Sequence, residues 1–456
     1  ILKEAAKEII TKWKYENIFF FIIFLLNSCS FDDKTGIWKN ENRGVLKEAK
    51  KPLSNFQKIS ISEKIFNKTV IFEDGTDIKR QVPLENIEWR DIFFSENNNL
   101  ANFSYNDLNE IKFISKKISR NKLENYFLVD KNKLIIGDIK GNLIIFSINK
   151  NIILNKFNFY KKRFKKIKKK LNYIVENNII YVTDNLGFVY AYNYMEQKIL
   201  WAKNYKVPFR SNLKLINNKL IASNQDNNLI FLDKRNGNTL KLIPTEESTI
   251  KNEFVNNLSL DENRLFFLNS FGSLYAIDIE DMSVLWFLNL NQTLDSTPSN
   301  LFSGSQIINN KSRVIVSSNQ FTYIIDSNNG SILSKENFSN KNIRPIIFNE
   351  LIFFITNNNF LICMNLEDNK ILYSYNLNEL ISSHLKTIQK NAEFKDFLLL
   401  NNKIFIFLKN SFILRLELEG NLLEIKKLPS KISSQPIIVD KAILYVNKKN
   451  KVAIIN

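Results

Sequence analysis

The sequence has few of the residues that most metal and redox sites require. Its 456 residues include two cysteines, Cys29 and Cys363, and one histidine, His384. A disulfide framework needs more thiols than this, and a zinc site of the cysteine–histidine type needs about four ligands. We therefore expect no disulfide, no metal centre and no cofactor, which excludes a large part of zinc, haem and thiol chemistry.

The apolar stretch near the N-terminus is too short to cross a membrane. It runs from Ile18 to Leu26 without a charge, whereas a spanning helix needs about 20 residues. A signal-peptide apolar region is about 7–15 residues long and follows positive charge, which Lys12 and Lys14 supply. The sequence then reads LNSC, ending at Cys29, and this resembles the lipobox of bacterial lipoprotein signal peptides.

That resemblance implies how the protein is processed and where it resides. Residues 1–28 would be a lipoprotein signal peptide, and acyl chains, palmitate among them, on Cys29 would hold the protein to a membrane without a spanning helix. Ser30 rather than aspartate follows the cysteine, which by resemblance to enterobacterial lipoproteins favours the periplasmic face of the outer membrane. A buried helix that happens to contain a cysteine is the alternative.

A pattern of short apolar runs and turns recurs along most of the chain. One copy is KLIIGDIKGNLIIFSINKNIILNK, from Lys133. The runs are β-branched or aromatic and the turns are rich in Asn, Gly and Asp, which indicates strands and hairpins. The first aliphatic residues of the copies are Leu134, Ile179, Leu220, Leu265, Val314, Leu351, Ile404 and Ile443. Their mean period of about 44 residues matches four-stranded propeller blades. The sequence therefore predicts an all-β, eight-bladed β-propeller over residues 85–456; a pair of β-sandwiches, the alternative, leaves the constant period unexplained.

The eighth copy, from Ala442, ends after its second strand. An open blade leaves unpaired strand edges, so a propeller must close its ring. The alternating segment from Glu110 to Ile118 precedes the first copy and can supply the missing strand. We predict that it pairs with the strand around Val452 to Ile455 and so joins the N-terminal and C-terminal strands in one sheet.

Two copies carry a fuller motif. Trp201 follows Ala191 by ten positions, Trp286 follows Ala276 by the same spacing, and Tyr373 stands in the tryptophan position of the sixth copy. This resembles the pyrroloquinoline-quinone-type propeller repeat. In that repeat the small residue lets adjacent blades approach, and we expect the aromatic ring to pack between blades.

With the lipobox and the count of eight, the chain is similar to the BamB family of outer-membrane β-barrel assembly lipoproteins. The stretch from Ile87 to Asp107 also resembles the lead-in found before the first blade in alphaproteobacterial members. The resemblance implies a lipid-anchored periplasmic scaffold with no enzymatic activity, a monomer within a complex, bound to the periplasmic domain of an outer-membrane β-barrel assembly protein. Residues 29–84 match no known pattern, and we predict that they form a tether.

The family resemblance also implies a docking loop. Inter-blade loops with acidic and apolar residues contact the partner in this family, and the clearest match is NQTLDSTPSN, from Asn291. The residues implied to bind the partner are Leu294, Asp295, Thr297 and Pro298. The alternative is that Asp295 caps the turn before Pro298. Glu246 and Glu247 lie in a neighbouring loop of different length, and we assign them no role.

The charge balance is strongly basic, with 64 Lys and Arg against 46 Asp and Glu and a formal net charge of +18. A Lys-rich, generally solvated surface accounts for this, and a specific anionic partner is the alternative.

The positive charge is densest in one segment, YKKRFKKIKKKL, from Tyr160 to Leu171, which we call the basic segment. It is either a solvated inter-blade loop or a contact with anionic lipid or lipopolysaccharide; a periplasmic location excludes nucleic acid as a partner. The residues concerned are Lys161, Lys162, Arg163, Lys165, Lys166, Lys168, Lys169 and Lys170.

Quinoprotein dehydrogenases use the same repeat, so a periplasmic quinoprotein-like enzyme or a ligand-binding sensor propeller is the alternative function. Such enzymes resemble one another in a vicinal Cys-Cys disulfide, a calcium site and an Asp base. This sequence has no Cys-Cys pair and no C-x-x-C-H haem motif, and we predict no catalytic residue. Cys363 occupies the small-residue position of its strand and His384 lies in a polar insert, so we expect a buried, inert thiol and a solvent-facing histidine.

Overall fold

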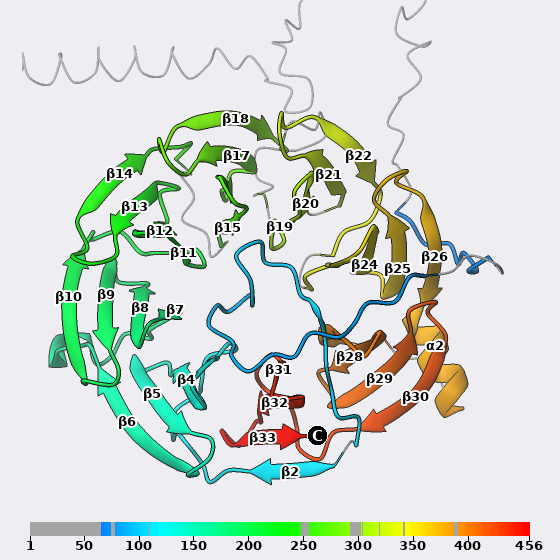
Figure 1. Ribbon diagram of the computed structural model, residues 1–456, viewed down its shortest axis with the longest axis horizontal. Helices are drawn as coiled ribbons and strands as arrows, with labels where there is room; N and C mark the ends of the chain where they lie inside the picture. The colour runs from blue at the N-terminus through cyan, green and yellow to red at the C-terminus, as the bar shows by residue number, and fades with distance from the viewer. Residues whose placement is uncertain are drawn as a thin grey trace, which may run out of the picture. The chain divides into compact units, whose positions relative to one another are not determined.

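The described residues form a closed ring of β-sheets. The computed structural model describes residues 65–73, 78–108, 110–247, 255–291, 302, 304–318, 320–340, 343–386 and 391–456, which all belong to one compact unit, Glu63–Asn456. Eight sheets stand around a common centre (Figure 1). The predicted all-β, eight-bladed propeller is therefore confirmed.

Each blade has four antiparallel strands, the first of which lies toward the centre of the ring. Blade 1 is β3 (Leu128–Asp130), β4 (Lys133–Gly137), β5 (Asn142–Ser147) and β6 (Ile152–Asn158). Blade 2 is β7 (Leu171–Glu176), β8 (Ile179–Asp184), β9 (Phe188–Asn193) and β10 (Lys198–Asn204). Blade 3 is β11 (Lys214–Ile216), β12 (Lys219–Ser223), β13 (Leu229–Asp233) and β14 (Thr239–Ile243). Blade 4 is β15 (Asn257–Leu260), β16 (Arg264–Leu268), β17 (Ser273–Asp278) and β18 (Val284–Asn289).

The second half of the ring repeats this order. Blade 5 is β19 (Ile308–Asn309), β20 (Arg313–Ser317), β21 (Thr322–Asp326) and β22 (Ile332–Glu336). Blade 6 is β23 (Ile346–Phe348), β24 (Leu351–Ile355), β25 (Phe360–Asn365) and β26 (Ile371–Asn376). Blade 7 is β27 (Phe394–Leu400), β28 (Lys403–Leu408), β29 (Phe412–Glu417) and β30 (Leu422–Lys427), with β1 (Asn102–Phe103) parallel to β27. Blade 8 is β31 (Ile437–Val439), β32 (Ala442–Val446), β33 (Val452–Ile455) and β2 (Ile111–Ile114). A 3₁₀ turn, η1 (Lys162–Phe164), and one described α-helix, α2 (Leu377–Leu385), lie between blades.

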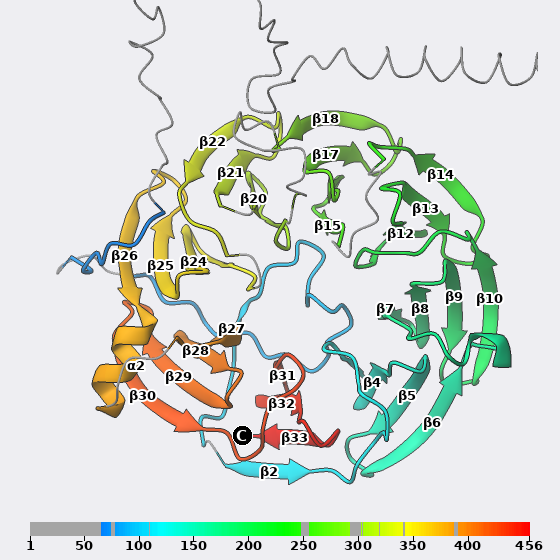
Figure 2. The ribbon, with the colours of Figure 1, turned by 180° about the vertical axis from the view of Figure 1, so that it is seen from behind.

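Blade 8 closes the ring with both ends of the propeller. β2 pairs antiparallel with β33, and Phe113 is the register partner of Ile454. Figure 2 shows β2 as the outermost strand of the sheet that contains the C-terminus. The predicted pairing of the segment Glu110–Ile118 with Val452–Ile455 is therefore confirmed.

Asparagine replaces glycine in many of the tight turns. The turns between first and second strands contain residues with positive φ, among them Asn132 (φ 60), Asn178 (φ 67), Asn217 (φ 50) and Asn349 (φ 53). Asparagine tolerates this left-handed conformation better than most residues because its short side chain bonds to the local backbone. This explains how a propeller with dozens of turns is built with only 11 glycines.

The motif aromatics pack between blades, as predicted. Trp201 of blade 2 pairs in register with Ala191, and its indole Nε1 donates a hydrogen bond of 3.0 Å to the carbonyl of Lys234 in blade 3. The ring lies against Gly237, where an added Cβ would come within 2.5 Å of it. Trp286 of blade 4 lies against Gly330 of blade 5 in the same way.

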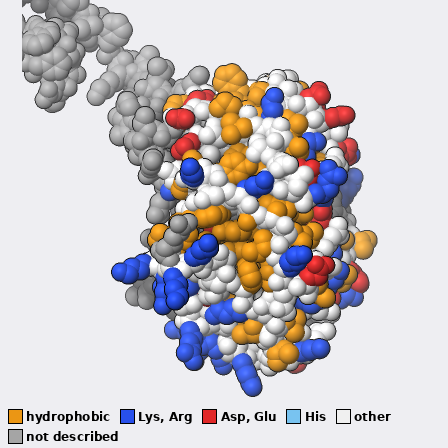
Figure 3. Space-filling view, turned by 90° about the vertical axis from the view of Figure 1, so that its left-hand side faces the viewer, with side chains coloured by type: hydrophobic (Ala, Val, Ile, Leu, Met, Phe, Trp, Pro, Cys, Tyr) orange, Lys and Arg blue, Asp and Glu red, His pale blue; other side chains and the backbone are white. Residues whose placement is uncertain are grey.

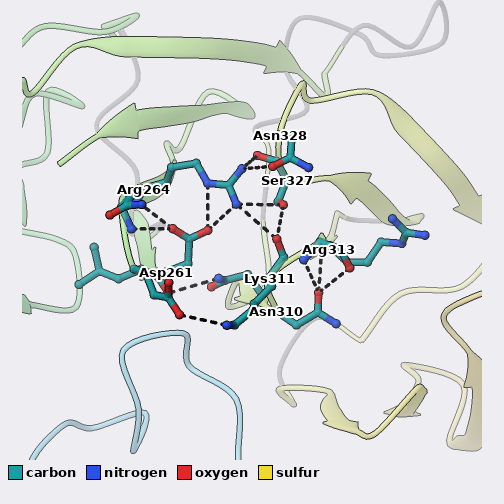
Figure 4. A network of polar contacts seen from close by, with 12 residues as sticks. Asp261, Arg264, Asn310, Lys311, Arg313, Ser327 and Asn328 are labelled. Atoms are coloured by element: carbon teal, nitrogen blue, oxygen red, sulfur yellow. Dashed lines mark hydrogen bonds and ion pairs between the residues drawn. The ribbon is translucent and has the colours of Figure 1, made fainter. Parts of the chain in front are cut away.

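Blades 4 and 5 are also joined by a polar network (Figure 4). Arg264 forms an ion pair of 2.7 Å with Asp261 in its own blade. The same guanidinium donates to the carbonyl of Ser327 at 2.6 Å and to Asn328 Oδ1 at 2.8 Å in blade 5. Each exposed surface ion pair is weak on its own, but this arginine is largely buried and its donors are shared between two blades.

The two faces of the ring carry different parts of the chain. The four strands of a blade are antiparallel, so the turns between second and third strands lie on one face, which we call the connection face. Each fourth strand ends at this face and each first strand begins there. The turns between first and second strands and between third and fourth strands lie on the opposite face. The basic segment connects blade 1 to blade 2, so it belongs to the connection face.

Candidate binding sites on the propeller

Two of the predicted sites lie outside the described residues. These are Cys29, with the whole predicted signal peptide, and the docking residues Leu294, Asp295, Thr297 and Pro298. The strands on either side of the docking loop are described: β18 ends at Asn289 in blade 4 and β19 begins at Ile308 in blade 5. The loop therefore links blades 4 and 5, as the sequence indicated.

Glu246, in the neighbouring loop that follows blade 3, bonds to the next blade in the ring, blade 4. Its carboxylate accepts hydrogen bonds from Tyr275 Oη at 2.7 Å, Ser273 Oγ at 2.8 Å and Asn269 Nδ2 at 2.9 Å. Burial raises the pKa of Glu246, but these hydrogen bonds outweigh burial and the pKa is below its usual value. Since its acceptor sites are committed to blade 4, Glu246 is poorly placed to contact a partner, whereas Glu247 is exposed.

The basic segment is anchored to blades 1 and 2 rather than freely solvated. Tyr160 donates a hydrogen bond of 2.6 Å to Asp184, and Phe164 packs edge-on against Phe188 with ring centroids 5.9 Å apart. The backbone N–H of Lys170 donates to Asn185 Oδ1 at 2.9 Å. The segment thus has a fixed base.

Lys169 differs from the other lysines of the segment because it points inward. It is 3 % exposed, donates to the carbonyl of Phe164, and lies 5.0 Å from the centroid of the Tyr160 ring. Burial, together with the nearby Lys140, holds its pKa below the usual value. Lys161, Lys162, Lys165, Lys166, Lys168 and Lys170 are exposed. The side chain of Arg163 lies outside what the structure describes.

The centre of the propeller is filled by the chain itself. Residues 86–106, which we call the channel segment, run through the middle of the ring (Figure 1). Trp89 is 2 % exposed and exchanges backbone hydrogen bonds of 2.7 and 2.9 Å with Val129 of blade 1. Asn98 is fully buried, and its Nδ2 donates to the carbonyls of Leu258 in blade 4 and Ile307 in blade 5, both at 2.8 Å.

Hydrogen bonds join the channel segment to the innermost part of every blade. The remaining blades are reached through Val175 to Arg90 (blade 2), Lys214 to Asp91 (blade 3), Asn99 to Ile347 (blade 6), Asn401 to Phe103 (blade 7) and Asp440 to Asn86 (blade 8). The sequence singled out this stretch only as a lead-in to the first blade. Its central position was missed, because an aperiodic segment gives no signal of where it docks.

Two buried cations hold the channel segment in place. The ammonium of Lys214 lies 2.7 Å from Asp91 Oδ2 and 2.8 Å from the carbonyl of Ser95. Arg344 donates to the carbonyls of Phe93 at 2.6 Å and Asn98 at 3.0 Å. Burial lowers the pKa of both cations. Removing the partner of a buried charge is costly, so these contacts fix the segment's position.

Two further polar side chains, those of Tyr126 and Asp396, lie near Arg344. Tyr126 packs edge-on against Phe93 with centroids 5.8 Å apart and accepts a hydrogen bond of 3.3 Å from Gln306. Asp396 is 4 % exposed, and its carboxylate accepts from the backbone N–H of Phe397 at 3.0 Å. Burial raises the pKa of Asp396 to about 6 although Arg344 opposes this.

The residues at the centre do not fit a quinone cofactor of the kind that the repeat family implies as the alternative. The channel segment takes the central space, and its hydrogen bonds use the inner strands that would otherwise face a ligand. The chain has no vicinal cysteine pair. Within the described ranges, no three His, Cys, Asp or Glu side chains gather as a metal site would require.

His384 lies at the rim of the propeller and Cys363 lies in its core. His384 is exposed on helix α2, which begins after the cap Asn376 and lies between the outer strands of blades 6 and 7 (Figure 1). It borders an open groove with Tyr375, Leu380 and Leu422. Cys363 is fully buried, faces Tyr373 in the register position of the motif alanine, and burial raises its thiol pKa. The polar insert therefore contains a helix, Leu377–Leu385, and Cys363 occupies the predicted small-residue position.

Comparisons with known proteins agree with the resemblance that the repeats show. Residues 162–375 match the profile of a family described as outer membrane protein assembly factor BamB, which confirms the predicted resemblance. No curated protein matches the sequence. Among the helices of the described residues, none is long and apolar enough to cross a membrane.

Solved structures share the fold. BamB from Moraxella catarrhalis superimposes with a TM-score of 0.58 at 10% identity, over 75% of this chain and 100% of that one. Quinohemoprotein alcohol dehydrogenase from Comamonas testosteroni gives 0.60 at 10% identity, over 81% of this chain and 80% of that one. At such identities the likeness shows the propeller fold alone, and the fold serves both an assembly factor and an enzyme.

Proposed function

We propose that this protein is a scaffold in the assembly of outer-membrane β-barrel proteins and has no catalytic role. It would be held to the periplasmic face of the outer membrane by acyl chains on Cys29 after removal of residues 1–28. Residues 29–84 would form the tether and residues 85–456 the propeller. The described part of that tether lies against blades 6 and 7, where Val70 bridges to Ser374 and Gln81 donates to Asn402.

The observation that carries this proposal is the family match over residues 162–375. The filled centre supports it, because the channel segment is hydrogen-bonded to the inner strands that would otherwise face a central ligand. A propeller whose strands are committed to packing recognises partners through its loops. This favours binding on the rim and faces over chemistry at the centre.

We propose that the loop between blades 4 and 5 contacts the partner through Leu294, Asp295, Thr297 and Pro298. Asp295→Arg should leave the fold intact and weaken partner binding. A buried charge contact costs about 2–5 kcal/mol when one member is removed, and a rim contact costs much less. Asp281→Arg makes the same charge change at an exposed turn on the opposite face of blade 4, so it is the matched control.

Affinity for the periplasmic domain of the barrel-assembly protein and melting temperature should be measured together for both variants. Lower affinity for Asp295→Arg alone, at an unchanged melting temperature, supports the docking loop. Equal affinity for both variants would eliminate the loop as the docking site. A lower melting temperature for Asp295→Arg alone would favour a turn-capping role for Asp295.

A quinoprotein-like enzyme or a ligand-binding sensor is the second candidate, favoured only by the shared fold of the alcohol dehydrogenase. Removing the gene distinguishes the two. A scaffold of barrel assembly predicts a fall in the amount of folded outer-membrane β-barrel proteins, restored by the wild-type chain. Unchanged barrel levels together with the loss of a quinone-dependent oxidation would instead support the enzyme.

A further inference from the structure

We propose that the connection face over blades 8, 1 and 2 forms one basic surface that lies on the anionic phospholipid headgroups of a membrane. We call it the basic sector. It consists of the basic segment together with residues 115–122, Lys140, Lys431 and the turn 447–451. This inference does not depend on the proposed partner, because it concerns a different part of the ring from the loop between blades 4 and 5.

Hydrogen bonds join these segments, which are far apart in the sequence, into one continuous surface. Ile118 N–H donates to the carbonyl of Asn450 at 2.9 Å, and Lys448 N–H donates to that of Lys431 at 2.8 Å. Ile139 N–H donates to the carbonyl of Lys122 at 3.1 Å, and Lys169 N–H donates to that of Ile139 at 2.9 Å. The surface therefore continues from the last blade across the closure of the ring to blade 2.

The sector exposes positive charge almost without opposition. Lys116, Lys117, Arg120 and Lys122 are exposed before blade 1, and Lys448 and Lys449 are exposed on blade 8. None of these segments contains an acid, and the acids next to them in the sequence are Glu124 and Asp138. Asp138 is fully buried and accepts hydrogen bonds from Asn142 at 2.8 Å. Glu124 is half-buried, so the outward-facing charge is positive.

The charge has a preferred side. Figure 3, which looks at the rim, shows lysine and arginine side chains gathered toward the lower left margin, where few acidic side chains are visible. The rest of the connection face includes the acids Asp226 and Glu247. A basic surface concentrated in one sector orients the molecule, whereas an evenly spread excess of lysine would not. Anionic headgroups attract each lysine or arginine that lies near the membrane surface.

The apolar residues of the basic segment favour a membrane over a nucleic acid. Ile167 is 44 % exposed and stands among lysines, the combination of charge and aliphatic contact found at membrane interfaces. Binding to single-stranded nucleic acid requires aromatic rings free to stack on bases. The rings of Tyr160 and Phe164 are instead packed against each other, with centroids 6.3 Å apart, and onto blade 2.

Vesicle binding tests the sector. The mature chain, residues 29–456, with Cys29→Ser, which cannot be acylated, is titrated with phosphatidylcholine vesicles that do or do not contain phosphatidylglycerol, at low and at physiological salt. The test variant carries Lys117→Gln, Lys448→Gln and Lys449→Gln, which leaves the basic segment unchanged. The control variant carries Lys150→Gln, Lys198→Gln and Lys311→Gln, three exposed lysines of the opposite face.

We expect binding only to the anionic vesicles, weakened by salt and lowered at least about tenfold in the test variant. The control variant should bind as the parent does. The proposal would be overturned if the test variant bound anionic vesicles as well as the control variant does. It would also be overturned if the parent bound neutral vesicles as well as anionic ones. Tighter, salt-sensitive binding to a single-stranded oligonucleotide than to the anionic vesicles would assign the surface to nucleic acid and overturn the proposal.

Discussion

At the scale of single residues, the tightest constraints lie where an aromatic ring meets a glycine. Gly330 has φ of +75° and Gly237 has φ of +72°, and each lies under a tryptophan of the preceding blade. Gly420 takes the corresponding place beside Tyr373 and Tyr375. The equivalent positions of blades 2, 4 and 6 are not glycine but Gln197, Met282 and Asn369, also with positive φ. The positive φ at this position therefore does not by itself require glycine. Glycine is required where an aromatic ring of the preceding blade lies against the position.

Gly330→Ala tests this directly. The new Cβ would lie 2.6 Å from Trp286 Cε3, so the ring must move in addition to the left-handed strain of about 1–3 kcal/mol. We expect a loss of at least about 2 kcal/mol in the free energy of unfolding. Asn369→Ala, at a position of the same conformation (φ 57) without a tryptophan in the preceding blade, should cost less. Urea denaturation of both variants measures the difference, and equal losses would show that the rings play no part.

The buried carboxyl group of Asp396 makes the stability of the fold depend on pH. The pKa of Asp396 is about 6 in the folded protein and about 3.9 in an unfolded chain. A raised pKa means that the folded state prefers the protonated carboxyl, so this contribution is complete below about pH 4 and is lost as the pH rises through about 6. The difference corresponds to roughly 2–3 kcal/mol.

Asp396→Asn removes this titration. An amide oxygen can still accept the hydrogen bond from Phe397 N–H, while no charge forms at high pH. The variant should be more stable than the parent at pH 8, by up to about 2 kcal/mol, and nearly equal to it at pH 4.5. Chemical denaturation at both pH values measures this, and a variant that is less stable at pH 8 would show that the ionised carboxylate is needed by Arg344.

At the scale of elements, the blades are linked in pairs. The motif aromatics occur in blades 2, 4 and 6, and the glycines that receive them occur in blades 3, 5 and 7. Blades 8 and 1 have neither and are joined instead through β2, which leads directly into the first blade. The polar network around Arg264 lies within the pair formed by blades 4 and 5. The closure strand therefore replaces an aromatic contact at the one place where the chain ends meet.

The ring depends on blade 8, in which β2 and β33 join the two ends of the propeller. Ile454 lies in β33, between β32 and β2, with Leu444 and Phe113 as register partners. Proline there removes a backbone donor from a strand that is paired on both sides, so Ile454→Pro should cost about 3 kcal/mol or more. The control is Leu333→Pro, because Leu333 lies at a bulge of the outermost strand β22, where proline is tolerated.

The two proline variants are compared by thermal unfolding. A large fall in melting temperature for Ile454→Pro alone is expected. Similar melting temperatures for the two variants would mean that blade 8 is not the closing blade in solution.

The elements also show what sequence reasoning could reach. The eight copies and the closing pair β2–β33 followed from period and alternation, because each blade is a local unit that repeats. The channel segment and helix α2 were missed, because neither repeats. The edge contact of Val70 with β26 and the convergence of the basic sector were missed for another reason. Both features depend on which residues, distant in the sequence, become neighbours when the ring closes. The pattern within a single repeat says nothing about those neighbours.

At the scale of the whole molecule, the propeller resembles a solid disc more than an open ring. A single segment touches all eight blades and fills the centre, so recognition is left to the faces and the rim. The predicted docking loop lies between blades 4 and 5 and the basic sector lies over blades 8, 1 and 2. The proposed partner site and the proposed membrane site therefore involve different blades, so one molecule has room to bind both at the same time.

The central claim is that this disc is a scaffold for barrel assembly. Purification of the tagged full chain from detergent-solubilised envelopes, followed by identification of what accompanies it, tests the claim most directly. We expect an outer-membrane β-barrel assembly protein in near-equal amount, reduced in Asp295→Arg and retained in Asp281→Arg. Recovery of no such protein, together with a bound quinone and a quinone-dependent dehydrogenase activity, would contradict the account.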